Sequence, residues 1–530
     1  MVQIDPSNAN ANGTTQPQSQ SSHADAAAVA IGQVADAVDA LGERSFDGPT
    51  ERETSRFGSF IWTLTAGFAL GGFKVGIRAL HDNSFFVHLG TGRWILDHGA
   101  VPQVDSYSFT SNGKPFVAQS WLASVVYRLL QISVGPIGIR IVMGLVAAII
   151  TGSIFRLANH LVGERRRASG LSLCVFAVVA AMYSERPLAF GLLGLVGLVW
   201  IVEAPGSRIG RRPEIALPLV MWLWANTHGS MALGYVFLAL HLVGRGLDGA
   251  WCWRRENAHE RKLALGGLLS IAVLLVNPYG PTLLLFPIEL MAKGGVLKDV
   301  VEWMSPDFHS PQGLAFGLWL VVSMSVLIRS RTTSRRDLVV VLPFVVLALW
   351  AMRNLAIATI IALPAVARAS VPRRARNAAA SQQSRQNFKL GGVIGIGVVV
   401  IGFVFAVQAA GEKQFNERGY SVEAYRFVKA TLGTNTRLLT TDANAGWMIA
   451  AHPEQKIFMD DRYDMFPAAI VSDYVTIARL HPGWREVLDK YRIQTVMWPT
   501  SNALTQLLDV DGEHFRRVYR DKDWTVFRRL

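Results

Sequence analysis

Long apolar runs recur along most of this chain, and they constrain its fold more than any other feature. A helix that crosses the hydrocarbon core of a bilayer needs roughly 20 predominantly apolar residues. About eleven such runs can be placed, near residues 59–80, 136–160, 168–184, 187–204, 214–226, 228–246, 263–278, 313–330, 337–352, 354–371 and 389–411. Only 17% of the residues are charged and 51% are hydrophobic. The sequence therefore predicts a polytopic α-helical membrane protein rather than a soluble enzyme.

Lys and Arg residues are divided unevenly between alternate loops. One set of loops carries about 21 of them and the opposite set about seven. Because cytoplasmic loops are enriched in Lys and Arg, we expect the first set and the N-terminus on the cytoplasmic side of a plasma (inner) membrane. The same bias accounts for the net charge of +13, so nucleic-acid binding is not expected. A span at residues 118–134 would break the alternation, and we expect an interfacial helix there instead.

Three regions follow from composition. Residues 1–55 are rich in Ser, Gln, Asn, Ala and Asp, which predicts a disordered cytoplasmic tail. Residues 56–411 are the predicted transmembrane domain, and its first outer loop covers residues 81–135. Residues 412–530 predict a small extracytoplasmic α/β domain. Its expected helices lie at 422–432 and 484–491, and its expected strands at 437–441, 456–459, 495–498 and 524–527.

The first outer loop starts with a carboxylate, Asp82, where the first span ends. Apolar residues from Phe85 to Leu96 then recur at helical spacing with polar residues between them. This pattern is typical of a helix that lies in a membrane interface. Gly99 and Pro102 are the signals that end this helix.

Several other turns deliver polar side chains to the side of the membrane where Asp82 is expected. The residues concerned are Glu185, Arg186, Asn226, His228, Glu302, Asp307 and Arg353. Each of them alone also fits a plain structural role, such as a solvated turn residue or, for Asp82, a helix cap. Charge near membrane depth is costly, however, so polar residues that gather there usually line a cavity or a pathway. Together these turns predict one site on the outer face.

The residue types in this predicted site suit an anionic lipid headgroup and a hydroxyl acceptor. Arg186 and Arg353 are able to hold a phosphate by bidentate hydrogen bonds, and we expect His228 beside them as a third phosphate ligand. Asp82 is the expected base for an incoming sugar hydroxyl. The remaining polar residues are expected on the acceptor side, and they are Glu302, Asp307 and Asn226.

Short motifs in a fixed order also give the chain a resemblance to a known superfamily. The motifs are Asp82…His88-Leu89-Gly90…Gly92…Ile95…Gly99…Pro102…Asp105…Ser108, Ser120-Trp121-Leu122, Arg186-Pro187, Trp224-Ala225-Asn226-Thr227-His228-Gly229, Asn277-Pro278-Tyr279-Gly280, Glu302-Trp303…Ser305-Pro306, Arg353-Asn354 and Asp460-Asp461-Arg462. They resemble a bacterial group of GT-C-like membrane proteins over about residues 59–530. The GT-C superfamily comprises membrane glycosyltransferases that use polyprenyl-phosphate-linked sugars.

The resemblance implies an acidic residue at the outer end of the first span and a helix along the membrane after it, which His81-Asp82-Asn83 and residues 84–98 match. Many GT-C enzymes place two acidic residues in the first outer loop, whereas here the neighbour of Asp82 is Asn83. The sequence therefore leaves open whether a divalent cation is a cofactor. Asp105 would be the second carboxylate only if the loop folds back. The run Asp460–Asp464 is either a contact to donor or acceptor or a surface turn with internal salt bridges.

The sequence therefore predicts a GT-C-like glycosyltransferase of the cell membrane. It would transfer a sugar from a polyprenyl-phosphate donor to a cell-envelope glycan, lipid or protein. Two alternatives remain at this point: a polymerase or ligase of lipid-linked oligosaccharides, and a non-catalytic transporter or scaffold that binds lipid-linked glycans in the same fold.

Overall fold

The computed structural model describes residues 51–292, 301–330, 333–371 and 388–530. Residues 1–50 of the predicted disordered tail lie outside the described residues. Residues 51–55 were also assigned to that tail, but they form the first turns of a helix. The chain divides into two units, residues 1–58 and residues 59–530. The pocket and the sheet described below belong to the second unit.

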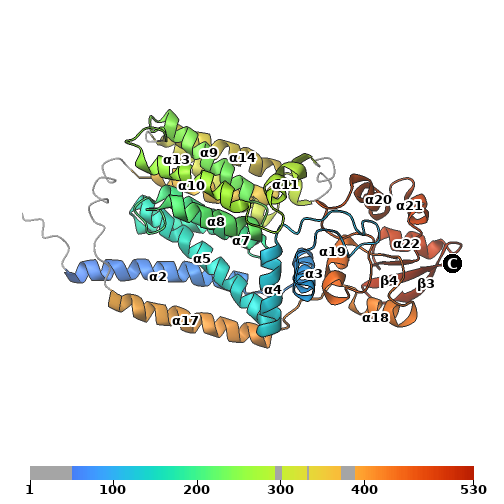
Figure 1. The fold of residues 1–530 in the computed structure, drawn as a ribbon. Helices are drawn as coiled ribbons and strands as arrows, with labels where there is room; N and C mark the ends of the chain where they lie inside the picture. Colours follow the sequence, from blue (N-terminus) through green and yellow to red (C-terminus); the bar gives the residue numbers. More distant parts are fainter. Residues whose placement is uncertain (1–50, 293–300, 331–332, 372–387) are drawn as a thin grey trace, which may run out of the picture. The chain divides into compact units, whose positions relative to one another are not determined.

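Each predicted span coincides with one helix, or with a helix and the short turn that continues it (Figure 1). These helices are α2 (Glu51–Gly76), α5 (Pro136–Val162), α6 (Arg165–Val179) with η1 (Ala180–Met182), α7 (Leu188–Glu203), α8 (Pro213–Thr227), α9 (Met231–Leu247), α10 (Ala258–Leu274), α13 (Pro311–Arg329), α14 (Arg335–Trp350), α15 (Leu355–Ala369) and α17 (Phe388–Gly411). Further short elements in this region are α11 (Pro281–Ala292), η2 (Val301–Trp303) and η3 (Met352–Asn354).

Three helical segments among the described residues are long and apolar enough, by length and composition, to cross a membrane. They are Pro136–Val162, Pro311–Arg329 and Met352–Ala369. Six described apolar helices are shorter, among them Leu188–Glu203 and Met231–Leu247. The chain is therefore mainly helical with an apolar character that suits a bilayer, and the number of helices that span it is a separate question.

The first outer loop contains two helices, α3 (Asn83–His98) and α4 (Trp121–Ser133). Asp82 caps α3 with its side chain, and Gly99 ends the helix at φ 64°, a conformation that glycine adopts without strain. The predicted end of this helix is thus confirmed. Its apolar residues were predicted to face a membrane interface, but Phe85, Phe86 and Leu89 are buried in protein. The reason is that α3 packs between α4 and α19 (Asp442–Ala451), as Figure 1 shows.

The C-terminal region contains a small sheet covered by short helices, as predicted. The strands are β1 (Leu438–Leu439), β2 (Thr495–Pro499), β3 (Phe515–Arg520) and β4 (Trp524–Arg529), and the further helices are α18 (Val422–Thr431), α20 (Ala468–Ala478), α21 (Trp484–Lys490) and α22 (Ala503–Val510). The strand order is β1-β2-β4-β3, with β1 and β2 parallel and the other pairs antiparallel. Strand β3 was missed because Arg and Tyr dominate its sequence.

The predicted strand at residues 456–459 is wrong, and the reason involves the first outer loop. Ile457 forms only isolated bridges, one to Leu438 of β1 and one to Ser108. Its carbonyl accepts a hydrogen bond from the Phe109 amide at 2.9 Å, and its amide donates to Tyr107 O at 3.2 Å. The loop thus pairs with the C-terminal domain beside β1, and this contact holds residues 460–464 close to α3.

Three helices connect the pocket described below with an ion-pair cluster at their other ends. Helix α7 starts directly after Arg186 and ends at Glu203, and α15 follows Arg353 and reaches Arg368 in its last turn. Arg368 Nη2 donates to Asp337 Oδ1 at 2.6 Å, and Arg368 Nη1 also pairs with Glu203. Because Asp337 lies in the first turn of α14, this cluster ties α7, α14 and α15 together at the end remote from the pocket.

Candidate active site

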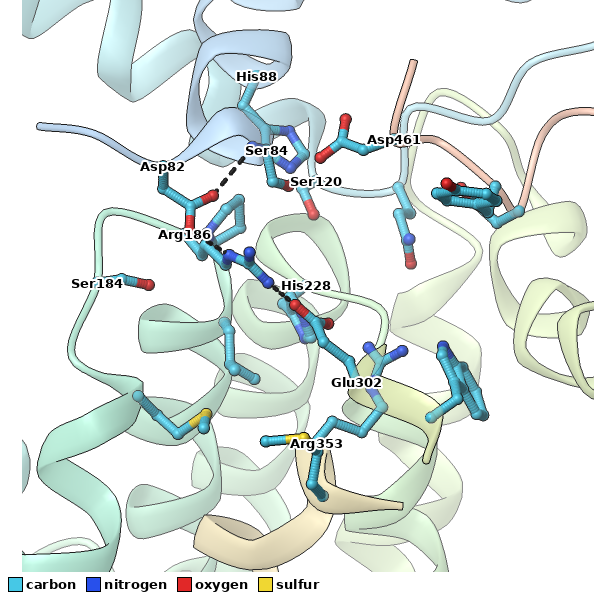
Figure 2. Close-up of a pocket in the computed structure, with 18 of the residues that line it drawn as sticks. Asp82, Ser84, His88, Ser120, Ser184, Arg186, His228, Glu302, Arg353 and Asp461 are labelled. Carbon is cyan, nitrogen blue, oxygen red and sulfur yellow. Dashed lines mark hydrogen bonds and ion pairs between the residues drawn. The ribbon is translucent and has the colours of Figure 1, made fainter. Parts of the chain in front are cut away.

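Turns from distant parts of the chain enclose one polar cavity of about 420 Å³. Its walls come from the start of α3, the turn before α7, the turn between α8 and α9, the short helices η2 and η3, and residues 461–464 of the C-terminal domain. Five of the seven predicted site residues line it, and they are Asp82, Arg186, His228, Glu302 and Arg353. Figure 2 shows their side chains facing a common space.

Asp82 is held firmly from two directions. Its Oδ1 accepts hydrogen bonds from the backbone amides of Ser84 at 2.9 Å and Phe85 at 3.4 Å, because helix α3 begins there with unpaired N–H groups. Its Oδ2 accepts a hydrogen bond from Arg186 Nε at 2.6 Å. Both the predicted cap role and the predicted place in the site therefore apply to the same carboxylate.

Arg186 lies between two carboxylates in the middle of the cavity. Its Nε donates to Asp82, while its Nη1 donates to Glu302 (Figure 2). A planar guanidinium with donors on separate edges is able to serve two partners at once, which the single ammonium of a lysine cannot do in this geometry. Glu302 was predicted on the acceptor side, but its carboxylate contacts this arginine.

Glu185 is a buried carboxylate that sequence reasoning left without a role. Its Oε1 accepts hydrogen bonds from the backbone amides of His81 and, at 2.7 Å, of Asp82. Burial alone would raise the pKa of Glu185, but the bonds from His81 and the backbone outweigh it and lower the pKa. Glu185 therefore stays ionised and fixes the backbone from which the Asp82 side chain projects.

Asp461 brings a second carboxyl group to the cavity from the C-terminal domain. Its Oδ2 accepts a hydrogen bond from the Asn83 amide at 2.7 Å, and its buried Oδ1 has no hydrogen-bond partner among the described residues. Burial, with the nearby charges of Asp460 and Asp442, raises its pKa well above the ordinary range, although Arg186 opposes this. These surroundings therefore favour the protonated form of Asp461 over its carboxylate. Asn83, which stands where many GT-C enzymes have a second acidic residue, thus positions the carboxyl group of Asp461 from the C-terminal domain.

The neighbouring Arg462 forms a salt bridge within this run, as one alternative predicted, but the run is not a surface turn. It is buried, and its Nη2 donates to Asp105 Oδ1 at 2.7 Å and to Asp460 Oδ2 at 2.6 Å. Its guanidinium also lies over the rings of Tyr107 and Phe116. Asp105 was expected to be a second site carboxylate only if the loop folded back. Instead it is buried and anchors the first outer loop to the C-terminal domain.

His228 and Arg353 line the opposite wall of the cavity. The His228 Nδ1 atom is 2.8 Å from Ser230 Oγ, which fixes the ring at the turn between α8 and α9. The guanidinium of Arg353 lies 4.6 Å from the centre of the Trp303 ring. Such stacking orients the planar cation and leaves its edges for hydrogen bonding.

Two predicted acceptor-side residues are not part of the cavity. Asp307 is 69% exposed and pairs with His309 at 3.2 Å, so it is a solvated turn carboxylate. Asn226 is fully buried, and its Oδ1 accepts a hydrogen bond from Trp121 Nε1 at 2.7 Å. Its role is to join α8 to α4. Position in an outer turn thus does not determine which way a side chain points.

His88 also lines the cavity, although it was noted only as part of a motif. It lies four residues after Ser84, another lining residue, so both project from one face of α3. This spacing is the signal that sequence reasoning missed. Among the described residues, no group of three or more His, Cys, Asp or Glu side chains is arranged to hold a metal ion. Between Asp82 and Glu302, the position that a bridging cation would take is filled by the guanidinium of Arg186.

Comparison with known proteins gives matches among solved structures. No family model matches the chain, and no curated protein matches it. The archaeal oligosaccharyltransferase AglB from Archaeoglobus fulgidus, in complex with an inhibitory peptide and a dolichol-phosphate, aligns over 84% of this chain and 69% of its own, with 10% identity and a TM-score of 0.48. ArnT from Cupriavidus metallidurans bound to undecaprenyl phosphate aligns over 88% of this chain and 97% of its own, with 12% identity and a TM-score of 0.49.

Identities of 10% and 12%, with both TM-scores below 0.5, do not carry an activity from those proteins to this chain. What the cavity does has to be argued from its own residues.

Proposed function

We propose that this chain is a membrane glycosyltransferase that moves a sugar from a polyprenyl-phosphate donor to an acceptor at the outer face of the plasma membrane. The observation that carries the proposal is the chain of ion pairs Asp82–Arg186–Glu302 inside a polar cavity. In this proposal about eleven helices span the bilayer, the N-terminus is cytoplasmic, and residues 412–530 are extracytoplasmic. The acceptor is a glycan, lipid or protein of the cell envelope.

The sidedness of the cavity is supported by the helices that run away from it. Helix α7 has 16 residues, so about 24 Å separate Arg186 at its start from Glu203 at its end. The basic loops lie at that far end, where Arg336 and Arg368 pair with Glu203. Since basic loops mark the cytoplasmic side, the cavity belongs to the outer side.

The arginines supply a binding site for the donor phosphate. The Glu302 carboxylate on Arg186 Nη1 marks a position where an anionic oxygen is bound, and a phosphate oxygen of the donor would take that position. Arg353, oriented by Trp303, and His228 border the same space. As the bond between sugar and phosphate breaks, negative charge grows on the phosphate, and cations held in place stabilise that charge.

Asp82 supplies the opposite charge. Glycosyl transfer passes through a transition state in which the sugar ring becomes oxocarbenium-like and positive. A carboxylate fixed by the N-terminus of α3 and by Arg186 is able to stabilise that charge without leaving its partners. Asp82 was first expected to be the base, but a proton on its carboxylate would weaken the pair with Arg186, whereas a carboxylate that stays ionised keeps this pair.

The test uses purified full-length protein in lipid nanodiscs with a panel of labelled polyprenyl-phosphate sugars and cell-envelope acceptors. We expect transfer or donor hydrolysis that Asp82→Asn abolishes. Asp97→Asn is the matched control, because Asp97 is an exposed carboxylate near the other end of the same helix, paired with Arg93. If no donor in the panel gives Asp82-dependent turnover, or if both variants behave alike, the proposal is wrong.

A further inference from the structure

His88 differs from Asp82, Glu302 and Asp461 in what its hydrogen bonds leave free. Its ring enters the cavity from α3, on the side where Ser120 and Asp461 lie (Figure 2). Its Nδ1 is 3.2 Å from the hydroxyl oxygen of Ser124 on α4. Helices α3 and α4 come this close because Gly92 has no side chain. A Cβ atom there would collide with the backbone oxygen of Ser124.

The Ser124 hydroxyl decides which nitrogen of His88 carries the proton. That hydroxyl donates to the carbonyl oxygen of Ser120 at 3.1 Å. A hydroxyl has one proton, so toward His88 it acts as the acceptor. Nδ1 of His88 therefore carries hydrogen and donates to Ser124, and Nε2 carries the free lone pair. Among the described residues, Nε2 has no hydrogen-bond partner.

Charge around His88 keeps the ring neutral. Burial lowers the pKa of His88, and with the smaller contributions of the positive charges of Arg186 and Arg462 the pKa reaches about 4. Asp461 and His228 line the same cavity. The raised pKa of Asp461 disfavours a negative charge there, and such a charge would favour an imidazolium. At neutral pH the Nε2 lone pair is therefore available.

Four carboxyl groups in and beside the cavity already have partners. Both oxygens of Asp82 accept hydrogen bonds, and Glu302 is paired with Arg186. Glu185 Oε1 accepts two backbone hydrogen bonds, and Asp461 Oδ2 accepts a hydrogen bond from the Asn83 side chain. Protonation of Asp82 or Glu302 would weaken its pair with Arg186, whereas Nε2 of His88 takes up a proton without weakening any of these contacts.

We infer that His88 is the base of the proposed transfer reaction and that the acceptor group is a hydroxyl. This inference rests on the proposed function. The acceptor oxygen forms a bond to the anomeric carbon of the sugar while the bond between that carbon and the phosphate oxygen breaks. The electron pair of the broken bond goes to the phosphate, and the proton of the acceptor hydroxyl goes to Nε2 of His88. The products are the glycosylated acceptor, polyprenyl phosphate and an imidazolium that releases its proton to water.

Binding of the donor and departure of its phosphate both make His88 a stronger base. When donor phosphate binds at Arg186, its negative charge offsets the cation that disfavours protonated His88. As the phosphate leaves, it gains a further negative charge, so the imidazolium forms while the charge that stabilises it grows. An acceptor that is already an anion, such as a phosphate, would need no base. The free lone pair on His88 thus points to an alcohol as the acceptor class.

The central experiment compares His88→Asn with His98→Asn. The asparagine amide at position 88 retains a donor toward Ser124 but provides no base, whereas His98 is an exposed histidine of the same helix, stacked on Trp94. We expect His88→Asn to bind undecaprenyl phosphate normally and to transfer sugar to an alcohol about 10²- to 10⁴-fold more slowly. With azide, an anionic nucleophile that carries no proton, both variants should match the unaltered protein. Retained alcohol transfer, or an equal loss with azide, would overturn the inference.

A second measurement tests the histidine itself and needs no donor. Diethyl pyrocarbonate acylates only unprotonated imidazole nitrogens, and mass spectrometry of the full-length protein locates the label. From pH 7 to pH 5, labelling of N-acetylhistidine added to the same tube should fall about 25-fold, as expected for an ordinary pKa near 6.5. Labelling of His88 should change less than twofold. If His88 is unlabelled or follows the standard, the inference is wrong even when transfer is found. If His88 behaves as expected and no donor is used, the fault lies with the proposed function.

Discussion

Replacing Arg186 is the perturbation whose effect follows most directly from the geometry. Its Nε donates to Asp82 at 2.6 Å and its Nη1 donates to Glu302. The arginine side chain is 29% exposed, Asp82 is 11% exposed and Glu302 is 40% exposed. The pair with Asp82 is thus largely shielded from solvent, while the pair with Glu302 is partly solvated and easier for a ligand to replace.

The magnitudes follow from the number of charged hydrogen bonds that each variant keeps. A hydrogen bond to a charged group contributes about 1.5–3 kcal/mol. Arg186→Lys retains the charge but has one nitrogen for two directions, so it loses one such bond to the donor phosphate and about 10- to 150-fold in affinity. Arg186→Met also leaves Asp82 without its cation. Because Asp82 is only partly buried, we expect about 2–4 kcal/mol of lost stability, somewhat below the value for a fully buried pair.

The assay measures the dissociation constant of undecaprenyl phosphate and the thermal unfolding of both variants in nanodiscs. Arg93→Met is the control, because Arg93 pairs with Asp97 on the exposed side of α3, 44% and 57% exposed, and such pairs contribute less than about 1 kcal/mol. We expect it to leave affinity unchanged. If Arg186→Lys binds as tightly as the unaltered protein, Arg186 does not hold the phosphate and the reasoning about the cavity is refuted.

Three further substitutions have defined outcomes. Arg140→Met should lower the free energy of unfolding by about 2–6 kcal/mol, because the fully buried guanidinium donates to two backbone carbonyls as well as to Glu412. Glu412→Gln is the control. It keeps an acceptor for Arg140 and should change the free energy of unfolding by less than about 1 kcal/mol. In the unaltered protein, the raised pKa of Asp461 keeps the proton on the folded state after the unfolded state has lost it, so stability should fall by about 1.4 kcal/mol per pH unit as pH rises above 4. Asp461→Asn should remove this loss. Identical pH profiles of the two melting temperatures would contradict the prediction. Gly92→Ala should force α3 away from Ser124 and lower the melting temperature, and an unchanged melting curve would show that the two helices adjust freely.

The helices of the chain were accessible from the sequence because they depend on local patterns. Apolar runs of roughly the bilayer thickness fixed the positions of α5, α13 and the other long helices. Asp82 and Gly99 fixed the two ends of α3, since cap preferences depend only on a few neighbouring residues. In the C-terminal domain the same approach located β2 and β4, and it failed for β3 and for residues 456–459. Strand pairing there depends on partners that lie far away in the sequence.

The candidate site was accessible only in outline. The bias of Lys and Arg between loops placed Asp82, Arg186, His228, Glu302 and Arg353 on one side, and all five line the cavity. That bias concerns whole loops, so it gave no information about the direction of a single side chain. The same loop pattern predicted Asn226 and Asp307 as site residues. In the structure the Asn226 side chain points into the protein and the Asp307 side chain points into solvent.

What the sequence determined by itself was the class of protein, the order of its helices and the set of turns that carry charge, because hydrophobic length and loop charge act residue by residue along the chain. The tertiary structure decided which charges meet. It placed the guanidinium of Arg186 between two carboxylates, and through Asn83 it placed Asp461 of a different domain beside the first outer loop. It also set the orientation of His88 against α4. Electrostatic interactions and hydrogen bonds depend on distances of a few ångströms between residues hundreds of positions apart, and only the folded chain fixes those distances.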